Sequence, residues 1–330
     1  MNNTTSKELS IEQSASLSAA VVNEVAKAIV GKRETLELVM TAFLCPGGHV
    51  LLEDFPGLGK TLLASSFARV MGMDFKRIQF TPDLLPGDIT GGYVFDAAAN
   101  RFTVRRGPVF SHVLLADEIN RASPKTQSAL LEAMQERQVT LEGETLPLPD
   151  PFIVIATQNP VEYEGTFSLP EAQLDRFIVR LSLGYPRPEE EAEILMRRVA
   201  RKADNMILEK VINPDTLLAM RRSVETVFID PDVMTYIVNL VNASRNHAQV
   251  AVGSSPRGSL ALLKLSRAWA ALHGREYVTP DDIKLFCDPV MSHRIILDPS
   301  LWDVRGSDRK TVREIEKSVT VPVFKGGHAQ

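Results

Sequence analysis

Cysteine is scarce in this sequence of 330 residues, and the only two, Cys45 and Cys287, lie far apart. Neither has a partner at the spacing of metal ligands, which argues against a zinc site and a disulfide framework. Two isolated cysteines fit buried thiols in a reducing compartment. The opening residues MNNTTSKELSIEQSAS also lack the basic and apolar regions of a signal peptide, so we expect a cytoplasmic chain.

Long apolar runs and excess positive charge are missing as well. No apolar stretch is long enough to span a bilayer, so we expect no direct membrane insertion. The formal net charge is −4, which provides no general basic surface for a phosphate backbone. Nucleic-acid binding would therefore need a local basic patch, and we do not expect it.

Hydrophobic residues make up 44% of the chain, enough for a large core, and the length favours two domains. Short apolar runs alternate with helical patterns, which predicts an α/β fold with a parallel sheet covered by helices on both faces. Two segments, ITGGYVFDAAANRFTVRRGP and RQVTLEGETLPLP, have the pattern of inserted β-hairpins. The expected strands are HVLLED, FKRIQF, HVLLADE, FIVIATQ and FIVRLSL.

Helical patterns dominate after about residue 188. The segments NPDTLLAM, DPDVMTYIVNLV, SPRGSLALLKL and TPDDIKLFC each combine a capping residue with a proline in the first turn. We therefore predict a boundary near Pro186 and Pro188. It separates an α/β domain with N-terminal helices (residues 1–187) from an all-helical domain with a C-terminal tail (residues 188–330).

The stretch LLEDFPGLGKT is nearly a phosphate-binding loop, G-x-x-x-x-G-K-[ST]. In that motif backbone N–H groups surround the phosphates, the lysine reaches the β and γ positions, and the hydroxyl holds Mg²⁺. Gly59, Lys60 and Thr61 match it, but Asp54 occupies the position of the first glycine. Aspartate tolerates tight turns and often bonds its own nearby backbone. Its position lies at the exit from the expected strand, farther from the phosphates than Gly57 and Gly59, and strand, glycine turn and helix follow in the required order, so we expect the loop to work. A plain glycine turn is the alternative.

The segment VLLADE is an apolar run that ends in two acids. An acid at the end of a strand near a phosphate loop can hold Mg²⁺ through water, which suits Asp117. The next residue, Glu118, would then polarise an attacking water as a base. A solvated strand end is the alternative for both.

Three further segments carry a family resemblance. INRASPKTQSALLEAMQERQVTLEGETLPLPDPFIVIATQNP, RIQFTPDLLPGDITG and LPEAQLDRF closely resemble the MoxR family of AAA+ ATPases, from about Ile29 to the helices near residue 290. The resemblance implies an AAA+ core with inserted hairpins and a helical lid, and a Mg²⁺-dependent ATPase. LLEDFPGLGKT is close to what such chains carry.

The resemblance also implies residue roles. Asn159 matches the sensor 1 residue that helps position the lytic water, and its alternative is a turn residue before proline. Arg176 matches an arginine finger inserted by a neighbouring subunit, against a salt bridge with Asp175 or Glu171. Arg257 matches sensor 2, which would link nucleotide state to the angle between domains, against a surface arginine. The implied ATP-binding residues are Ile29, Val30, Gly31, Pro56, Gly57, Leu58, Gly59, Lys60, Thr61 and Leu62, with Thr61 and Asp117 at the metal.

For the whole protein, the resemblance implies a homo-oligomeric ring, expected to be a hexamer, that assembles, matures or activates a protein complex as a chaperone does. Its client would be a protein with a von Willebrand factor A domain. A nucleic-acid motor, the motor subunit of a metal chelatase and a regulatory nucleotide switch remain alternatives. Tyr93, Phe95 and Phe102 in the first hairpin either contact the client or pack against the hairpin's own core.

Overall fold

A five-stranded parallel sheet forms the centre of the computed structural model, which describes residues 9–159, 166–302, 304 and 306–322. Residues 1–8, Pro160 and the end of the C-terminal tail thus lie outside the described residues. The strand order is β2-β5-β8-β1-β9, and all neighbours run parallel, so the five predicted strands are confirmed. Their bounds are β1 (Val50–Glu53), β2 (Phe75–Gln79), β5 (Val113–Asp117), β8 (Ile153–Gln158) and β9 (Val179–Leu181).

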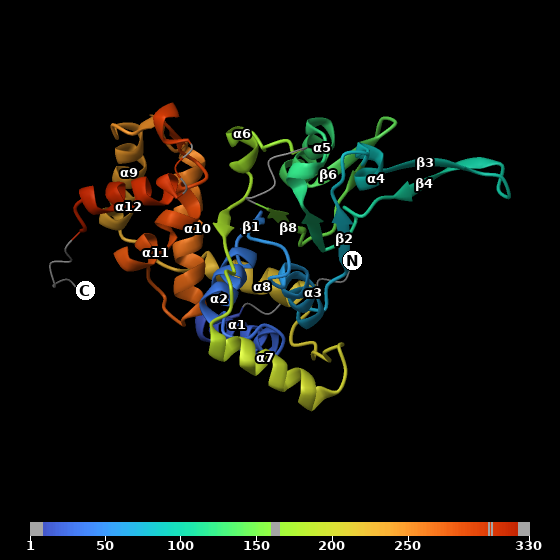
Figure 1. Ribbon diagram of the computed structural model, residues 1–330, viewed down its shortest axis with the longest axis horizontal. Helices are drawn as coiled ribbons and strands as arrows, with labels where there is room; N and C mark the ends of the chain where they lie inside the picture. The colour runs from blue at the N-terminus through green and yellow to red at the C-terminus, as the bar shows by residue number, and fades with distance from the viewer. Residues whose placement is uncertain (1–8, 160–165, 303, 305, 323–330) are drawn as a thin grey trace.

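Helices cover both faces of the sheet. On one side lie α1 (Ile11–Ala26), α2 (Arg33–Phe43) and α3 (Lys60–Val70), and on the other α4 (Pro86–Thr90) and α5 (Pro124–Glu136), as Figure 1 shows. Alternate strand residues enter two separate cores, for example Val50 and Leu52 on one face and Leu51 on the other. Burial on both faces explains why the strands are continuously apolar.

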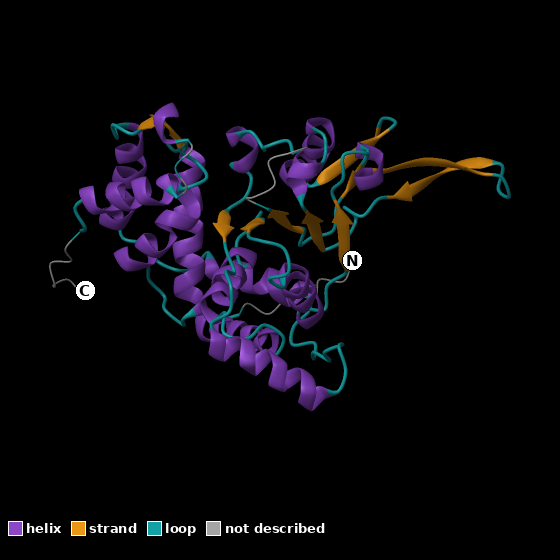
Figure 2. Cartoon of the chain, viewed as in Figure 1, coloured by secondary structure: helices purple, strands orange, loops and turns teal. Residues whose placement is uncertain are grey.

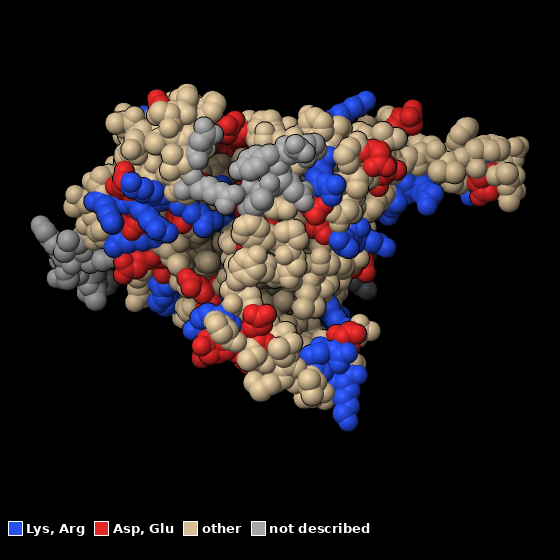
Figure 3. Space-filling view, in the orientation of Figure 1, with Lys and Arg blue, Asp and Glu red and all other residues tan. Residues whose placement is uncertain are grey.

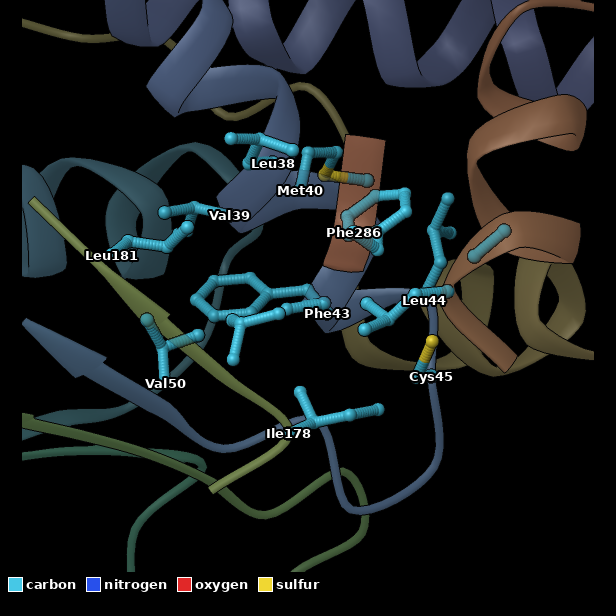
Figure 4. Packing of buried hydrophobic residues seen from close by; sticks show 14 of the residues in the cluster. Leu38, Val39, Met40, Phe43, Leu44, Cys45, Val50, Ile178, Leu181 and Phe286 are labelled. Carbon is cyan, nitrogen blue, oxygen red and sulfur yellow. The ribbon is translucent and has the colours of Figure 1, made fainter. Parts of the chain in front are cut away.

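The core below the sheet is tightly packed around the end of α2. Phe43 is fully buried and meets the ring of Phe67 edge to face, with centroids 5.2 Å apart. Figure 4 shows Phe43 directed toward Val50, which begins β1, with Ile178, which precedes β9, on the same side. This contact joins the N-terminal helices firmly to the sheet.

Both predicted hairpins are present. The first is β3 (Gly91–Asp96) with β4 (Arg101–Arg106), and it projects far from the body of the molecule in Figure 2. The second is β6 (Gln138–Leu141) with β7 (Glu144–Pro147), joined by a two-residue turn. In this turn Glu142 and Gly143 have φ of 46° and 87°, as a tight hairpin turn requires. The Tyr93 hydroxyl donates to the Glu144 carboxylate at 2.5 Å, so the two hairpins are tied together.

The rest of the chain is predominantly helical. Its six helices among the described residues are α7 (Pro188–Arg201), α8 (Pro214–Val224), α9 (Pro231–Arg245), α10 (Pro256–Leu272), α11 (Pro280–Met291) and α12 (Ser307–Ser318). The four predicted starts are confirmed, with a proline in the first turn of each helix. One short antiparallel pair, β10 (Val250–Val252) with β11 (Ile296–Leu297), was not predicted because these segments are too short to have a pattern.

The N-terminal helices pack against the helical part. Nε of Arg221 in α8 donates to the Phe43 carbonyl at 2.9 Å, and the Ser14 and Ser223 hydroxyls lie 2.6 Å apart. Helix α1 ends at Ala26, with Lys27 as its C-cap. Gly31 is therefore not the C-cap glycine of this helix, since the chain leaves the helix five residues earlier, before the apolar pair that precedes this glycine. No helix in the described ranges is long and apolar enough to cross a membrane.

Candidate functional site

The turn between β1 and α3 has the backbone shape of an anion-binding loop. Gly57 and Gly59 have φ of 84° and 83°, a region that favours glycine. A Cβ at Gly57 would meet nothing within 4 Å, so the backbone conformation explains this glycine and crowding does not. Helix α3 begins directly after Gly59, so its free N–H groups point into the loop. The residues present thus fit a bound phosphate chain.

Lys60 already lies in the loop. Its side chain is buried, and Nζ donates to the carbonyl oxygens of Asp54 and Phe55 at 2.6 Å and 3.2 Å. Thr61 follows in the first turn of α3, where its hydroxyl can serve a cation beside the phosphates. Pro56 and Gly57 are exposed at the tip, while Leu58 is half-buried and Leu62 is 46% exposed.

Asp54 has a different role from the one expected. Its buried carboxylate accepts hydrogen bonds from the Ser182 hydroxyl at 2.7 Å and from the N–H groups of Leu183 and Gly184 at 2.6 Å and 3.0 Å. The expectation that it bonds its own nearby backbone is wrong. The donors come from the segment after β9, because β9 is the sheet neighbour of β1.

The two acids of VLLADE meet a threonine that sequence reasoning missed. Asp117 is the last residue of β5, and its Oδ1 accepts from the Thr157 hydroxyl at 2.6 Å. The same hydroxyl oxygen accepts from the Glu118 N–H at 2.8 Å. Arg77 in β2 donates to the other oxygen of Asp117, with Nη2 at 2.7 Å. Thr157 therefore fixes both acids relative to β8.

Glu118 is held in one orientation. Its φ is 55°, a left-handed conformation that is costly for a glutamate and is commonly found at functional sites. Its carboxylate accepts from Gln79 Nε2 at 2.6 Å and from Arg121 Nη1 at 2.9 Å. Gln79 and Arg77 could not be found from the sequence, since the register that places Gln79 opposite Asp117 depends on the order of the strands.

Asn159 follows β8, which lies between the strands that carry the phosphate loop and the acids. All these groups therefore lie at the carboxyl edge of the sheet, where ligands bind in open α/β folds. In the described part of the chain, no three His, Cys, Asp or Glu side chains form a metal site of their own. Thr61 and Asp117 fit Mg²⁺ only with oxygens from a phosphate chain, which is the usual way proteins bind this ion.

The apolar residues near Ile29 also reach this region. Ile29 Cδ1 lies 4.0 Å from where a Cβ on Gly59 would stand, and Ile29 and Val30 are each 7% exposed. At Gly31, with φ of 73°, a Cβ would stand 2.1 Å from Cδ of Glu190. Glycine is required there because the start of α7 packs directly onto the backbone.

Arg176 and Arg257 lie elsewhere. Arg176 follows α6 (Glu171–Leu174) and precedes β9, so it stands at the amino edge of the sheet. Its Nη1 donates weakly to the Ala172 carbonyl at 3.4 Å, and no described carboxylate pairs with it, so the expected alternative of a local salt bridge is not seen. Arg257 is half-exposed, and its Nη1 lies 3.5 Å from Oδ2 of Asp175.

Asp175 is held by the helical part. Its carboxylate accepts from Arg294 Nε at 2.7 Å and from the Ser255 hydroxyl at 3.2 Å. Arg294 is buried and also donates to the carbonyls of Phe177 and Val290. This network anchors the segment that carries Arg176 to α10 and α11.

Four cations line one depression of about 270 Å³ at this edge: Arg137, Arg176, Arg257 and Lys264. Gly47, from the connection that leads into β1, forms another part of its wall, and no residue of the phosphate loop contributes. Arg137 and Lys264 were missed because they lie far apart in sequence, Arg137 as the C-cap of α5 and Lys264 within α10. The predicted site residues are thus divided between two opposite edges of the sheet.

A buried histidine lies behind this depression. Burial lowers the pKa of His49 to about 3, because the charged ring would be removed from water. Its Nδ1 accepts from the Val154 N–H at 3.0 Å, which requires that Nδ1 carry no proton and therefore that the ring be neutral.

Comparisons with known proteins agree with this geometry. Residues 49–179 match the ATPase family associated with various cellular activities (AAA), and residues 242–315 match the AAA lid domain. The chain is 48% identical to the uncharacterized protein YeaC of Bacillus subtilis over 92% of its own length and 94% of that protein. It is 41% identical to Chaperone MoxR1 of Mycobacterium tuberculosis, over 91% and 81% of the two chains. A solved candidate ATPase from Cytophaga hutchinsonii superposes with a TM-score of 0.86 at 40% identity, covering 94% of this chain and 96% of that one.

Proposed function

The chain belongs to the MoxR family of AAA+ ATPases, and from this premise we propose that it hydrolyses ATP with Mg²⁺ in sites shared between neighbouring subunits of a ring. The ring is a hexamer in the cytoplasm, and it uses the energy of hydrolysis to remodel a protein complex as a chaperone does.

The observation that carries this proposal is the separation of the site into two halves. Lys60 and Glu118 lie at the carboxyl edge of the sheet, and Arg176 lies at the amino edge of the same sheet. One chain cannot bring both halves to one phosphate. A ring of identical chains can, because a heterologous interface places one edge of each subunit against the opposite edge of the next.

Each half has a chemical task. Lys60 and the N–H groups of the loop bind the phosphates, and Thr61 and Asp117 hold the metal ion, which supplies charge neutralisation at the transferred phosphoryl group. Glu118 accepts the proton of the attacking water, and Asn159 orients that water. Arg176 and Arg257, from the next subunit, stabilise the charge that develops in the transition state. Arg257 thus acts across the interface between subunits.

The first hairpin is suited to a protein client. Phe95 and Phe102 are 51% and 67% exposed, and their rings meet edge to face with centroids 5.3 Å apart. Tyr93 instead packs at the base of the hairpin and holds Glu144, which leaves Phe95 and Phe102 as the aromatics that can meet a client. Exposed aromatic pairs are strong anchors at protein interfaces. We propose a client with a von Willebrand factor A domain.

A nucleic-acid client has less support. On the face shown in Figure 3, positive and negative side chains are interspersed, without a continuous basic band. The second hairpin carries Glu142 and Glu144 at its turn, which would repel a phosphate backbone.

A mixing experiment tests the shared site. Glu118→Gln removes the base and keeps the arginines, while Arg176→Ala removes one arginine and keeps the base. Each variant alone should be inactive. Random co-assembly should give roughly a quarter of the interfaces one intact Glu118 and one intact Arg176, so activity should return to about that fraction.

The control mixes Glu118→Gln with a chain that carries both substitutions, because no interface in that mixture is complete. Native mass measurements in ATP establish the ring size and co-assembly. Mixed rings of the two single variants that stay as inactive as this control would refute the shared site.

A further inference from the structure

We propose that Asp54 is a positioning residue that couples the phosphate loop to residues 182–187, the linker between β9 and α7. This inference rests on the proposed ATP binding and adds a route by which ATP binding affects the position of the helical part. Asp54 stands where the phosphate-loop motif has a glycine, and a glycine has no side chain with which to do this.

The carboxylate of Asp54 is committed entirely to the linker. It accepts from the hydroxyl of Ser182 and from two consecutive backbone N–H groups, those of Leu183 and Gly184. The side chain is 4% exposed, so these bonds are shielded from water. Charged acceptors with several N–H donors in a buried site form the stronger class of hydrogen bonds.

The backbone of the same residue is committed to the phosphate loop. Lys60 Nζ donates to the carbonyl oxygen of Asp54 at 2.6 Å and to the carbonyl oxygen of the next residue, Phe55, at 3.2 Å. A phosphate oxygen is a charged acceptor and competes with these neutral carbonyls for the ammonium group. When Lys60 exchanges its hydrogen bond to the Asp54 carbonyl for one to a phosphate, Asp54 is therefore the residue that can transmit this change to the linker.

The linker is held at further points around the same site. Lys32 Nζ donates to the Tyr185 carbonyl at 2.8 Å, and the rings of Tyr185 and Phe55 have centroids 5.9 Å apart. Glu190, in the first turn of α7, accepts from the Arg187 N–H at 2.9 Å and lies against Gly31. A shift at Asp54 is thus carried to the start of α7 through a short, tightly held segment.

The sharpest test restores the consensus motif. Asp54→Gly gives the loop its usual first glycine but leaves the Leu183 and Gly184 amides without their acceptor. Asp54→Asn keeps the shape and one acceptor oxygen, so it should fall between the glycine variant and the parent. Ser182→Ala is the matched control, since it removes the hydroxyl donor and leaves the hydrogen bonds from the Leu183 and Gly184 N–H groups in place.

The measurement is hydrogen exchange of peptides covering residues 182–187 in the full chain, with and without a non-hydrolysable ATP analogue. In the parent and in Ser182→Ala, the analogue should change the exchange rate of the linker. In Asp54→Gly, exchange should be faster by roughly tenfold or more and should not respond to the analogue. The affinity for the analogue should change less than about threefold, while kcat falls by roughly tenfold with little change in KM.

An Asp54→Gly chain whose linker still responds to the analogue, with the kcat of the parent, would overturn the coupling. If the glycine variant unfolds, the same comparison is made with Asp54→Asn, where a response equal to that of the parent overturns it. Failure of the parent itself to bind the analogue is a separate result, and it would overturn the proposed function together with the coupling.

Discussion

The two edges of the central sheet carry opposite chemistry. At the carboxyl edge, glycines with positive φ, one lysine and two acids surround the loop after β1, and every charged group there is held by hydrogen bonds. At the amino edge, four cations face one depression, and its acid, Asp175, is already bound to the buried Arg294. In the proposed function, the carboxyl edge holds a phosphate chain, and the cations of the amino edge approach the phosphate chain of a neighbouring subunit. On that proposal, each chain contains the parts of the site but no complete copy of it, because the parts lie at opposite edges of the sheet.

The largest expected effect separates binding from turnover. Lys60→Ala removes the ammonium group from the phosphate loop, so ATP affinity should collapse and turnover with it. Arg176→Ala changes only the opposite edge, so affinity should be nearly retained while turnover falls by roughly 10³ to 10⁵. Titration with a fluorescent ATP analogue and a steady-state phosphate assay measure the two quantities.

The contrast between these two variants is the informative result. Equal losses of affinity in both would mean that Arg176 reaches the nucleotide of its own chain, and the separation of the two edges would then be wrong.

A smaller effect is expected from the two cations that sequence reasoning missed. Arg137 and Lys264 line the same depression as Arg176, and neither pairs with a carboxylate among the described residues. Arg137→Ala and Lys264→Ala should each lower turnover about tenfold, as expected for one hydrogen bond to a charged group. ATP affinity should not change.

Lys284→Ala is the matched control for Lys264, because this lysine lies on α11 and pairs with Asp281 at 3.0 Å. If the depression does not meet the neighbouring nucleotide, Lys264→Ala will behave like this control.

The features that could be predicted from the sequence are those determined by interactions between residues a few positions apart. The strands, the hairpins and the proline-led helices were predicted correctly because apolar period, turn residues and caps act over a few positions. Lys60, Asp117 and Glu118 could be predicted as site residues for the same reason, since each sits in a short motif at the end of a strand.

The contacts around those residues could not be predicted. Asp54 meets Leu183, and Gln79 meets Glu118, only because β9 lies beside β1 and β2 lies beside β5. Strand order is a property of the whole sheet, and no local pattern encodes it. The position of Arg257 beside Asp175 likewise depends on how α10 packs, which no local pattern of the sequence encodes.

The smallest expected effect is on the pH dependence of stability, and it comes from His49, the neutral histidine behind the depression at the amino edge. Burial lowers the pKa of His49 to about 3, whereas an unfolded histidine titrates near 6.5. Between these values the unfolded chain binds a proton that the folded chain does not, so stability should fall as the pH drops below about 6.5. The loss from this residue should be about 1.4 kcal/mol between pH 7.5 and 5.5. His293, which is also buried with a lowered pKa, should add to it.

His49→Gln offers an amide that can still accept from the Val154 N–H and donate to the Met134 carbonyl, but it cannot take up a proton. The variant should be less stable than the parent at pH 7.5, and its stability should decline less toward pH 5.5, as measured by urea unfolding at both values. The same decline in both chains would mean that His49 is protonated in the folded state. The amino edge would then tolerate a fifth positive charge behind its depression. We expect the opposite, because the cations that line the depression are open to water, with Arg137, Arg257 and Lys264 exposed, whereas the ring of His49 is buried.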